Sequence, residues 1–283
     1  MCAGLDKCKG AILMTGTPTL NTRDALDETY VYPLGDGIRA GYICDYEILL
    51  PDVTSSDTGL PMELAEAKKG AHSPHLVQAL FLVNGMLMRG ARRCIAYLPT
   101  IAECDFFAEA VKLVCERYHY CDVWAESYTA ETNRATRDQL RLDFEAYDKK
   151  KEVDLRFLCS VHVLDEGVNV VECDSIFMPS APKSGVTFVQ RLCRANRLTD
   201  SNPSKVVCVF LWVEDHEDTM RTFRYLVKCD SACMQKCRIL GRDYGRGGDE
   251  ATRRRLESER VDFVRTLGLC GRSAREDRDE RGE

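Results

Sequence analysis

Short apolar runs alternate with longer stretches of helical spacing from residue 72 to residue 228. Apolar residues recur every three or four positions in 75–88 and 102–117, which predicts two amphipathic helices. Apolar runs predict strands at 94–98, 122–125, 155–160, 175–178 and 206–213. Strands that alternate with helices in this way form right-handed βαβ units. The predicted fold class is therefore α/β, with a parallel sheet flanked by helices on both faces.

The composition is that of an ordinary globular protein, with 45% hydrophobic and 30% charged residues and a formal net charge of -6. That charge argues against electrostatic coating of nucleic acid and leaves room for a local basic groove. No run of about 18 apolar residues and no signal-peptide pattern occurs. We expect no membrane partner and an intracellular location, cytoplasmic or nuclear, rather than secretion. The 15 cysteines, many in apolar runs, are expected to be buried free thiols.

The sharpest motif carries three arginines at spacings of three, preceded by a glutamine: Gln190, Arg191, Arg194 and Arg197. On a helix these arginines are expected along one side. Three neighbouring cations repel one another unless an anion answers them, and a triphosphate suits the guanidinium fork. The alternative is a solvated basic helix face.

These four residues resemble motif VI of the superfamily 2 helicases, Gln-Arg-x-Gly-Arg-x-x-Arg, with Cys193 at the usual glycine. The resemblance implies that Arg194 and Arg197 are catalytic fingers on the γ-phosphate. It also implies that Gln190 and Arg191 bind ATP.

Upstream, 164–170 resembles motif V of the restriction-type members, with Val171 at the family proline. Gly167 permits a sharp backbone turn, and Glu166 and Asn169 can bond sugar hydroxyls or arginines. The resemblance implies that Glu166 and Gly167 bind ATP. It also implies that Asn169 binds nucleic acid. The alternative is an acidic strand-to-loop turn.

Three further stretches fit the same family in the same order. Residues 94–111 resemble motif IV, with Thr100 at a helix N-terminus that suits a phosphate. Thr129 begins the stretch that links motifs IV and V, and with Thr100 it is implied to contact nucleic acid. Residues 14–18 resemble motif III, which implies that Thr15, Gly16 and Thr17 couple the nucleotide state to nucleic-acid grip. The alternatives are ordinary strand-to-helix turns and, after Thr129, a solvated polar helix.

The ordered matches over 11–213 imply the RecA-like C-terminal lobe of a superfamily 2 DNA or RNA helicase, of the restriction-enzyme or DEAD/DEAH-like type. No Gly-x-x-x-x-Gly-Lys-Ser/Thr and no Asp-Glu-x-His or Asp-Glu-Ala-Asp occurs. We therefore expect ATP and Mg²⁺ to be shared with a first lobe that this chain does not carry, and no ATPase from the isolated chain. Similarity to restriction enzymes favours DNA over RNA. The alternative is a non-catalytic nucleic-acid-binding or partner-docking module.

The expected organisation has five parts. It comprises a first-lobe remnant with motif III (1–50), a linker (51–70), the C-terminal lobe (71–230), a helical extension (231–270) and a charged, disordered tail (271–283). Cys229, Cys233 and Cys237 are four residues apart and share one face if that stretch is helical. Zinc binding is one interpretation, but packing of these thiols against the lobe is favoured, and no metal site is expected.

Overall fold

The computed structural model describes residues 32–51, 73–118, 122–146, 154–161, 170, 172–199, 204–212 and 216–240. The chain divides into two compact units, Met1–Tyr32 and Pro33–Glu283. The architecture below is that of the second unit.

The second unit is built on a seven-stranded sheet with the order β3-β4-β2-β5-β6-β1-β7. Every pair of neighbouring strands is parallel. The strands are β1 (Asp45–Pro51), β2 (Arg93–Tyr97), β3 (Asp122–Tyr128), β4 (Asp154–Ser160), β5 (Ser175–Met178), β6 (Val206–Leu211) and β7 (Cys237–Leu240).

The central strands are mostly apolar because both faces of the sheet are covered. In β2, Ile95 and Tyr97 enter one core, whereas Cys94 and Ala96 enter the core on the opposite face. This period of two follows from the pleat of a strand. It explains why these strands look like continuous apolar runs in the sequence.

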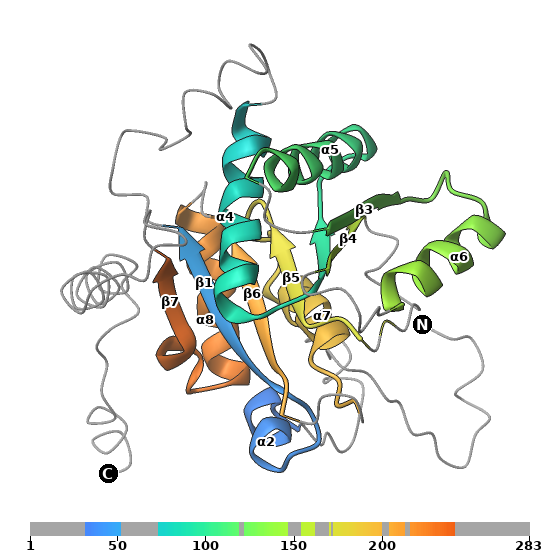
Figure 1. Ribbon diagram of the computed structural model, residues 1–283. Coiled ribbons are helices and arrows are strands. Elements are labelled where there is room, and N and C mark those ends of the chain that lie inside the picture. Colours follow the sequence, from blue (N-terminus) through green and yellow to red (C-terminus); the bar gives the residue numbers. More distant parts are fainter. Residues whose placement is uncertain are drawn as a thin grey trace, which may run out of the picture. The chain divides into compact units, whose positions relative to one another are not determined.

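Helices cover both faces. One face packs against α4 (Ser73–Arg89) and α5 (Ile101–Tyr118). The other face packs against α2 (Leu34–Arg39), α6 (Arg134–Glu145), α7 (Gly185–Ala195), α8 (His216–Cys229) and the 3₁₀ turn η2 (Cys233–Lys236). Figure 1 shows α4 in front of the strands and α7 behind them. The predicted α/β sheet with helices on both faces is confirmed.

The strands and helices predicted within 75–213 occur within a few residues of their expected bounds. Two parts of the expected organisation differ. Asp45–Pro51 pairs with β6 and β7, so it belongs to the same sheet as the later strands and not to a separate remnant ending at residue 50. Its apolar Ile48-Leu49-Leu50 run is buried in the shared core, which accounts for its place there.

The second correction concerns the stretch after residue 230. Residues 233–240 form η2 and β7 instead of the start of a helical extension. The prediction that Cys229, Cys233 and Cys237 share one helical face is therefore wrong, since they lie in α8, η2 and β7. Cys233 and Cys237 are buried in the core, and Cys229 packs against it.

Motif III with Thr15, Gly16 and Thr17, the linker up to residue 70 and the segment from 241 onward lie outside the described residues. Among the described helices, none combines the length and apolar character that a membrane span requires.

Candidate functional site

The arginine-bearing helix α7 is held close to α8 by a glycine. A Cβ added to Gly185 would lie 2.3 Å from the Cβ of Tyr225, a separation that packed side chains do not reach. Phe188, Leu192 and Ala195 turn the apolar side of α7 into the core. The sequence thus fixes both the position of α7 and the side of it that stays accessible.

Arg191 is more deeply buried than the other two arginines. It is buried, and its guanidinium carbon lies 4.6 Å from the centroid of the Tyr97 ring. A guanidinium stacked on an aromatic face is attracted by the ring electrons, more strongly where water is excluded. Arg191 therefore ties α7 to the carboxyl end of β2.

Arg194 and Arg197 are half-buried. The helix ends at Ala195 with Asn196 as its C-cap, so Arg197 lies beyond the last turn. Arg191 and Arg194 are three residues apart on α7, which is the spacing of one helix side, whereas the expectation that Arg197 continues this helix is wrong. Gln190 is half-buried beside Arg191.

Cys193, which stands where the family motif has glycine, packs against the core next to these arginines. Burial raises the pKa of its thiol, although Arg194 and Arg197 act in the opposite direction. The thiol is therefore protonated near neutral pH and acts here as a small apolar group.

The carboxyl ends of β2, β4 and β3 bring three hydroxyl-bearing residues into one row. Tyr97 pairs in register with Ser160, and Ser160 pairs with Tyr128. Ser160 is buried, and its Oγ has no hydrogen-bond partner in the described part of the chain. A buried hydroxyl without a hydrogen-bond partner lowers the stability of the fold by roughly 1–3 kcal/mol unless a water or a ligand bonds to it. This row was not predicted from the sequence. The signal that could have revealed it is that each of the three strands ends with a hydroxyl-bearing residue.

Thr100 lies at the same sheet edge, immediately before α5. Its Oγ1 accepts a hydrogen bond from the Glu103 amide (3.2 Å) and donates one to the Glu103 carboxylate (2.8 Å). Thr100 thus caps the start of α5 and satisfies one of its amides from within the chain. Thr100 was expected to mark a phosphate-binding helix start. The negative charge of the Glu103 carboxylate, which bonds Thr100, would repel a phosphate there.

Thr129 follows β3 directly and is buried. Its amide donates to Thr132 Oγ1 at 3.3 Å, and the two threonine hydroxyls are 3.4 Å apart. The structure thus brings Thr100 and Thr129 to one edge of the sheet, with the row of Tyr97, Ser160 and Tyr128 between them.

Glu166, Gly167 and Asn169 lie outside the described residues. Among the described residues, no group of three or more His, Cys, Asp or Glu side chains could hold a metal ion. Arg194 and Arg197 fit a phosphate anion, whereas this described surface offers no ligand set for Mg²⁺.

Comparisons with known proteins concern one domain and the fold. Residues 75–199 match the model of the helicase conserved C-terminal domain. A comparison with curated protein sequences gives no match.

Two solved structures share the fold at low sequence identity. One is the ATP-dependent Type ISP restriction-modification enzyme LlaBIII bound to DNA, with a TM-score of 0.66 and 17% identity over 86% of this chain and 18% of that chain. The other is a fragment of a putative HsdR subunit of a type I restriction enzyme from Vibrio vulnificus YJ016, with a TM-score of 0.57 and 16% identity over 80% of this chain and 43% of that chain. This chain therefore spans less than half the length of either. Residues 75–199 are thus similar to the helicase conserved C-terminal domain, and the sheet that contains them has the RecA-like α/β fold of these two structures.

Proposed function

We propose that this chain supplies the arginine half of an ATP site in a superfamily 2 nucleic-acid-dependent ATPase or helicase. A first RecA-like lobe that this chain does not carry would complete the site with a phosphate-binding loop and the ligands for Mg²⁺. The observation that carries the proposal is the half-buried pair Arg194 and Arg197 at the end of a helix that core packing and the Arg191–Tyr97 contact hold in place.

In this proposal Arg194 and Arg197 neutralise charge that develops on the γ-phosphoryl group during transfer. Arginine suits this role because its charge is fixed and its fork matches phosphate oxygens. Phosphoryl transfer depends mainly on positioning and electrostatic stabilisation, so a rigidly held cation lowers the barrier without forming a covalent bond. Arg191, stacked on Tyr97, would orient α7 and answer phosphate charge from farther away.

Nucleic acid would bind at the carboxyl edge of the sheet, near Thr100 and Thr129. The buried Ser160 hydroxyl supports this placement, since no other described residue forms a hydrogen bond with its Oγ at that edge. Asn169 would contribute from the segment that follows β4. DNA is the preferred track because the two similar structures are restriction enzymes and one is bound to DNA.

A second function is favoured by one observation on the sequence. The chain has no phosphate-binding loop, so the lobe could serve as a non-catalytic nucleic-acid-binding or partner-docking module. The two functions differ in whether ATP is hydrolysed once a first lobe is present.

The experiment mixes the purified chain with a first lobe that bears a phosphate-binding loop, taken from the reading frame upstream of this chain. ATP hydrolysis is measured for each protein alone and for the mixture, with duplex DNA, single-stranded DNA or RNA added. The proposal expects negligible hydrolysis by this chain alone and DNA-stimulated hydrolysis by the mixture. A mixture no more active than the first lobe alone supports the docking module and overturns the proposal.

A further inference from the structure

Cys44 lies immediately before β1 and forms hydrogen bonds with the backbone at the end of the arginine-bearing helix α7. Its amide donates to the Asn196 carbonyl at 2.7 Å. Its thiol donates to the Arg197 carbonyl at 3.1 Å. Asn196 caps α7, and the last carbonyls of a helix need partners from outside the helix. Cys44, which is 153 positions before Arg197 in the sequence, thus bonds the carbonyl of the C-cap residue and the carbonyl of the residue that follows it.

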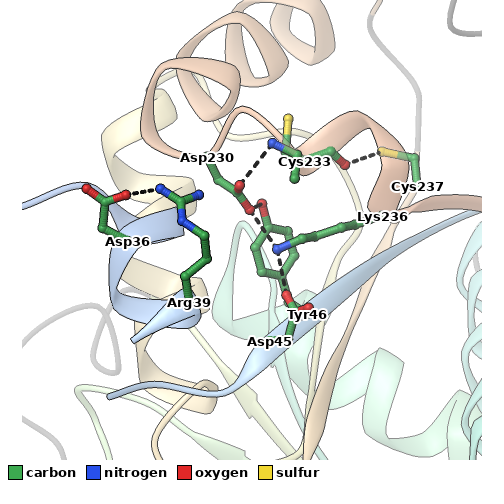
Figure 2. Close-up of polar contacts among 9 residues, drawn as sticks. Asp36, Arg39, Asp45, Tyr46, Asp230, Cys233, Lys236 and Cys237 are labelled. Atoms are coloured by element: carbon green, nitrogen blue, oxygen red, sulfur yellow. Dashed lines mark hydrogen bonds and ion pairs between the residues drawn. The ribbon is translucent and has the colours of Figure 1, made fainter. Parts of the chain in front are cut away.

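The two residues after Cys44 are fixed from the other side, as Figure 2 shows. Lys236 Nζ lies 2.6 Å from Asp45 Oδ1 and 2.8 Å from Asp230 Oδ2. The Tyr46 hydroxyl donates to the same Asp230 oxygen at 2.9 Å. Asp45 and Tyr46 therefore cannot shift without breaking contacts to the turn between α8 and β7.

Asp230 is the centre of this network, with a side chain that is 1% exposed. Its other oxygen accepts the Ala232 amide at 3.0 Å. Burial by itself raises the pKa of Asp230, but bonds from Lys236, Ala232 and Tyr46 outweigh it and the net shift is downward. A buried carboxylate with all of these donors is a rigid anchor, because moving it leaves buried charges unpaired.

We propose that Cys44 is a positioning residue for Arg197, and that Asp45, Tyr46, Asp230 and Lys236 hold Cys44 in place. We name these five residues the Cys44 clasp. The role rests on the proposed function, in which Arg197 contacts the γ-phosphate. Arg197 lies past the last turn of α7, so its backbone position depends on contacts such as the bond from the Cys44 thiol. When a catalytic group is misplaced by about 1 Å, the rate of the reaction falls by roughly 100-fold.

The test compares three variants in the mixture with the first lobe. Cys44→Ala removes the thiol donor, and Cys44→Ser restores a hydroxyl donor. Cys159→Ala is the matched control, since Cys159 is equally buried but lies in the core on the opposite face of the sheet. The clasp predicts that kcat for ATP falls about 10- to 100-fold in Cys44→Ala with KM unchanged, because Arg197 acts mainly on the transition state.

Cys44→Ser is expected to recover most of this loss, and Cys159→Ala to retain the parent kcat. Tyr46→Phe, which keeps the thiol and removes one bond to Asp230, is expected to give a smaller fall than Cys44→Ala. Equal kcat in Cys44→Ala and Cys159→Ala overturns the inference, and so does a loss that Cys44→Ser does not recover.

A second readout needs no ATPase and so separates this inference from the proposed function. Hydrogen–deuterium exchange of the isolated chain reports the Cys44 amide, which is bonded to Asn196. The clasp predicts exchange at 42–46 that is about tenfold faster in Cys44→Ala than in Cys159→Ala. Equal exchange overturns the clasp even if the parent mixture hydrolyses no ATP, an outcome that would separately contradict the proposed function.

Discussion

The guanidinium of Arg191 lies 4.6 Å from the ring centroid of Tyr97, and both side chains are buried. This contact joins the arginine-bearing helix to the strand whose carboxyl end begins the proposed nucleic-acid edge. It connects the two parts of the proposed site.

The Arg191–Tyr97 contact is expected to contribute measurably to stability. Tyr97→Leu removes the aromatic face and Arg191→Met removes the charge while keeping an apolar side chain. A double-mutant cycle followed by urea unfolding should give a coupling energy of about 0.5–2 kcal/mol. Tyr97→Phe keeps the ring and should retain most of the coupling. A coupling energy near zero would show that the stacking is incidental.

Gly185 is expected to tolerate no larger residue. Gly185 is the first residue of α7, where Gly→Ala stabilises by roughly 0.4–1 kcal/mol through the entropy of the unfolded chain if the added Cβ has room. Here the added Cβ would meet Tyr225 at 2.3 Å. Overpacking of this kind costs about 1–3 kcal/mol, so Gly185→Ala should lower the free energy of unfolding. Urea denaturation measures the sign, and a more stable variant would contradict the close packing of α7 on α8.

Stability should depend on pH through Asp230 and Lys236. The pKa of Asp230 is lowered in the folded protein from its usual 3.8, so its contribution is present above that value and is lost as pH falls through the folded pKa. Burial lowers the pKa of Lys236, but Asp230 and Asp45 outweigh burial, so the net pKa is raised above its usual 10.5. The contribution of Lys236 to stability is therefore lost only as pH rises through this raised pKa. Between these limits, Asp230→Asn should destabilise the fold by about 3–5 kcal/mol, the usual result of breaking a buried pair.

Below about pH 3.8 the gap between Asp230→Asn and the parent should narrow, because protonation removes the same charge from the parent. Thermal unfolding at a series of pH values measures this gap. The account fails if the gap is constant from pH 3 to pH 7.

Glu103 is expected to weaken nucleic-acid binding at the edge that carries Thr100. Glu103→Gln keeps an acceptor for the Thr100 hydroxyl at the start of α5 and removes the negative charge. Binding of labelled DNA at low salt should tighten several-fold, since like charges repel across a short distance. Glu109→Gln is the control, because this exposed residue lies on the same helix and pairs with Lys112. Fluorescence anisotropy measures both, and equal affinities would place the nucleic acid elsewhere.

Much of the fold could be predicted from the sequence because both faces of the sheet are covered. Buried strands such as Ser175–Met178 then stand out as apolar runs between helical stretches. The place of Asp45–Pro51 between β6 and β7 could not be predicted, since pairing between strands so far apart leaves no local signal. The same holds for Cys237–Leu240, whose two ends are buried and whose middle is half-exposed, a pattern too short to separate from a helix.

The candidate site was predictable in type and less so in geometry. The spacing of Gln190, Arg191, Arg194 and Arg197 places cations near one another, but it does not tell which one is buried. That depends on Tyr97, which is 94 positions before Arg191 in sequence. The bond from Cys44 to Arg197 is equally non-local and carries no motif.

The central claim is that Arg194 acts on ATP, and the rate of ATP hydrolysis by the mixture with a first lobe tests it most directly. Arg194→Ala is compared with Arg221→Ala, an exposed arginine on the neighbouring α8 that pairs with Glu217 and Asp218. At saturating ATP and DNA, the account predicts that Arg194→Ala loses roughly 10³-fold or more in kcat and that Arg221→Ala keeps the parent rate. An Arg194→Ala chain that stays folded and hydrolyses ATP at the parent rate would contradict the arginine-finger assignment.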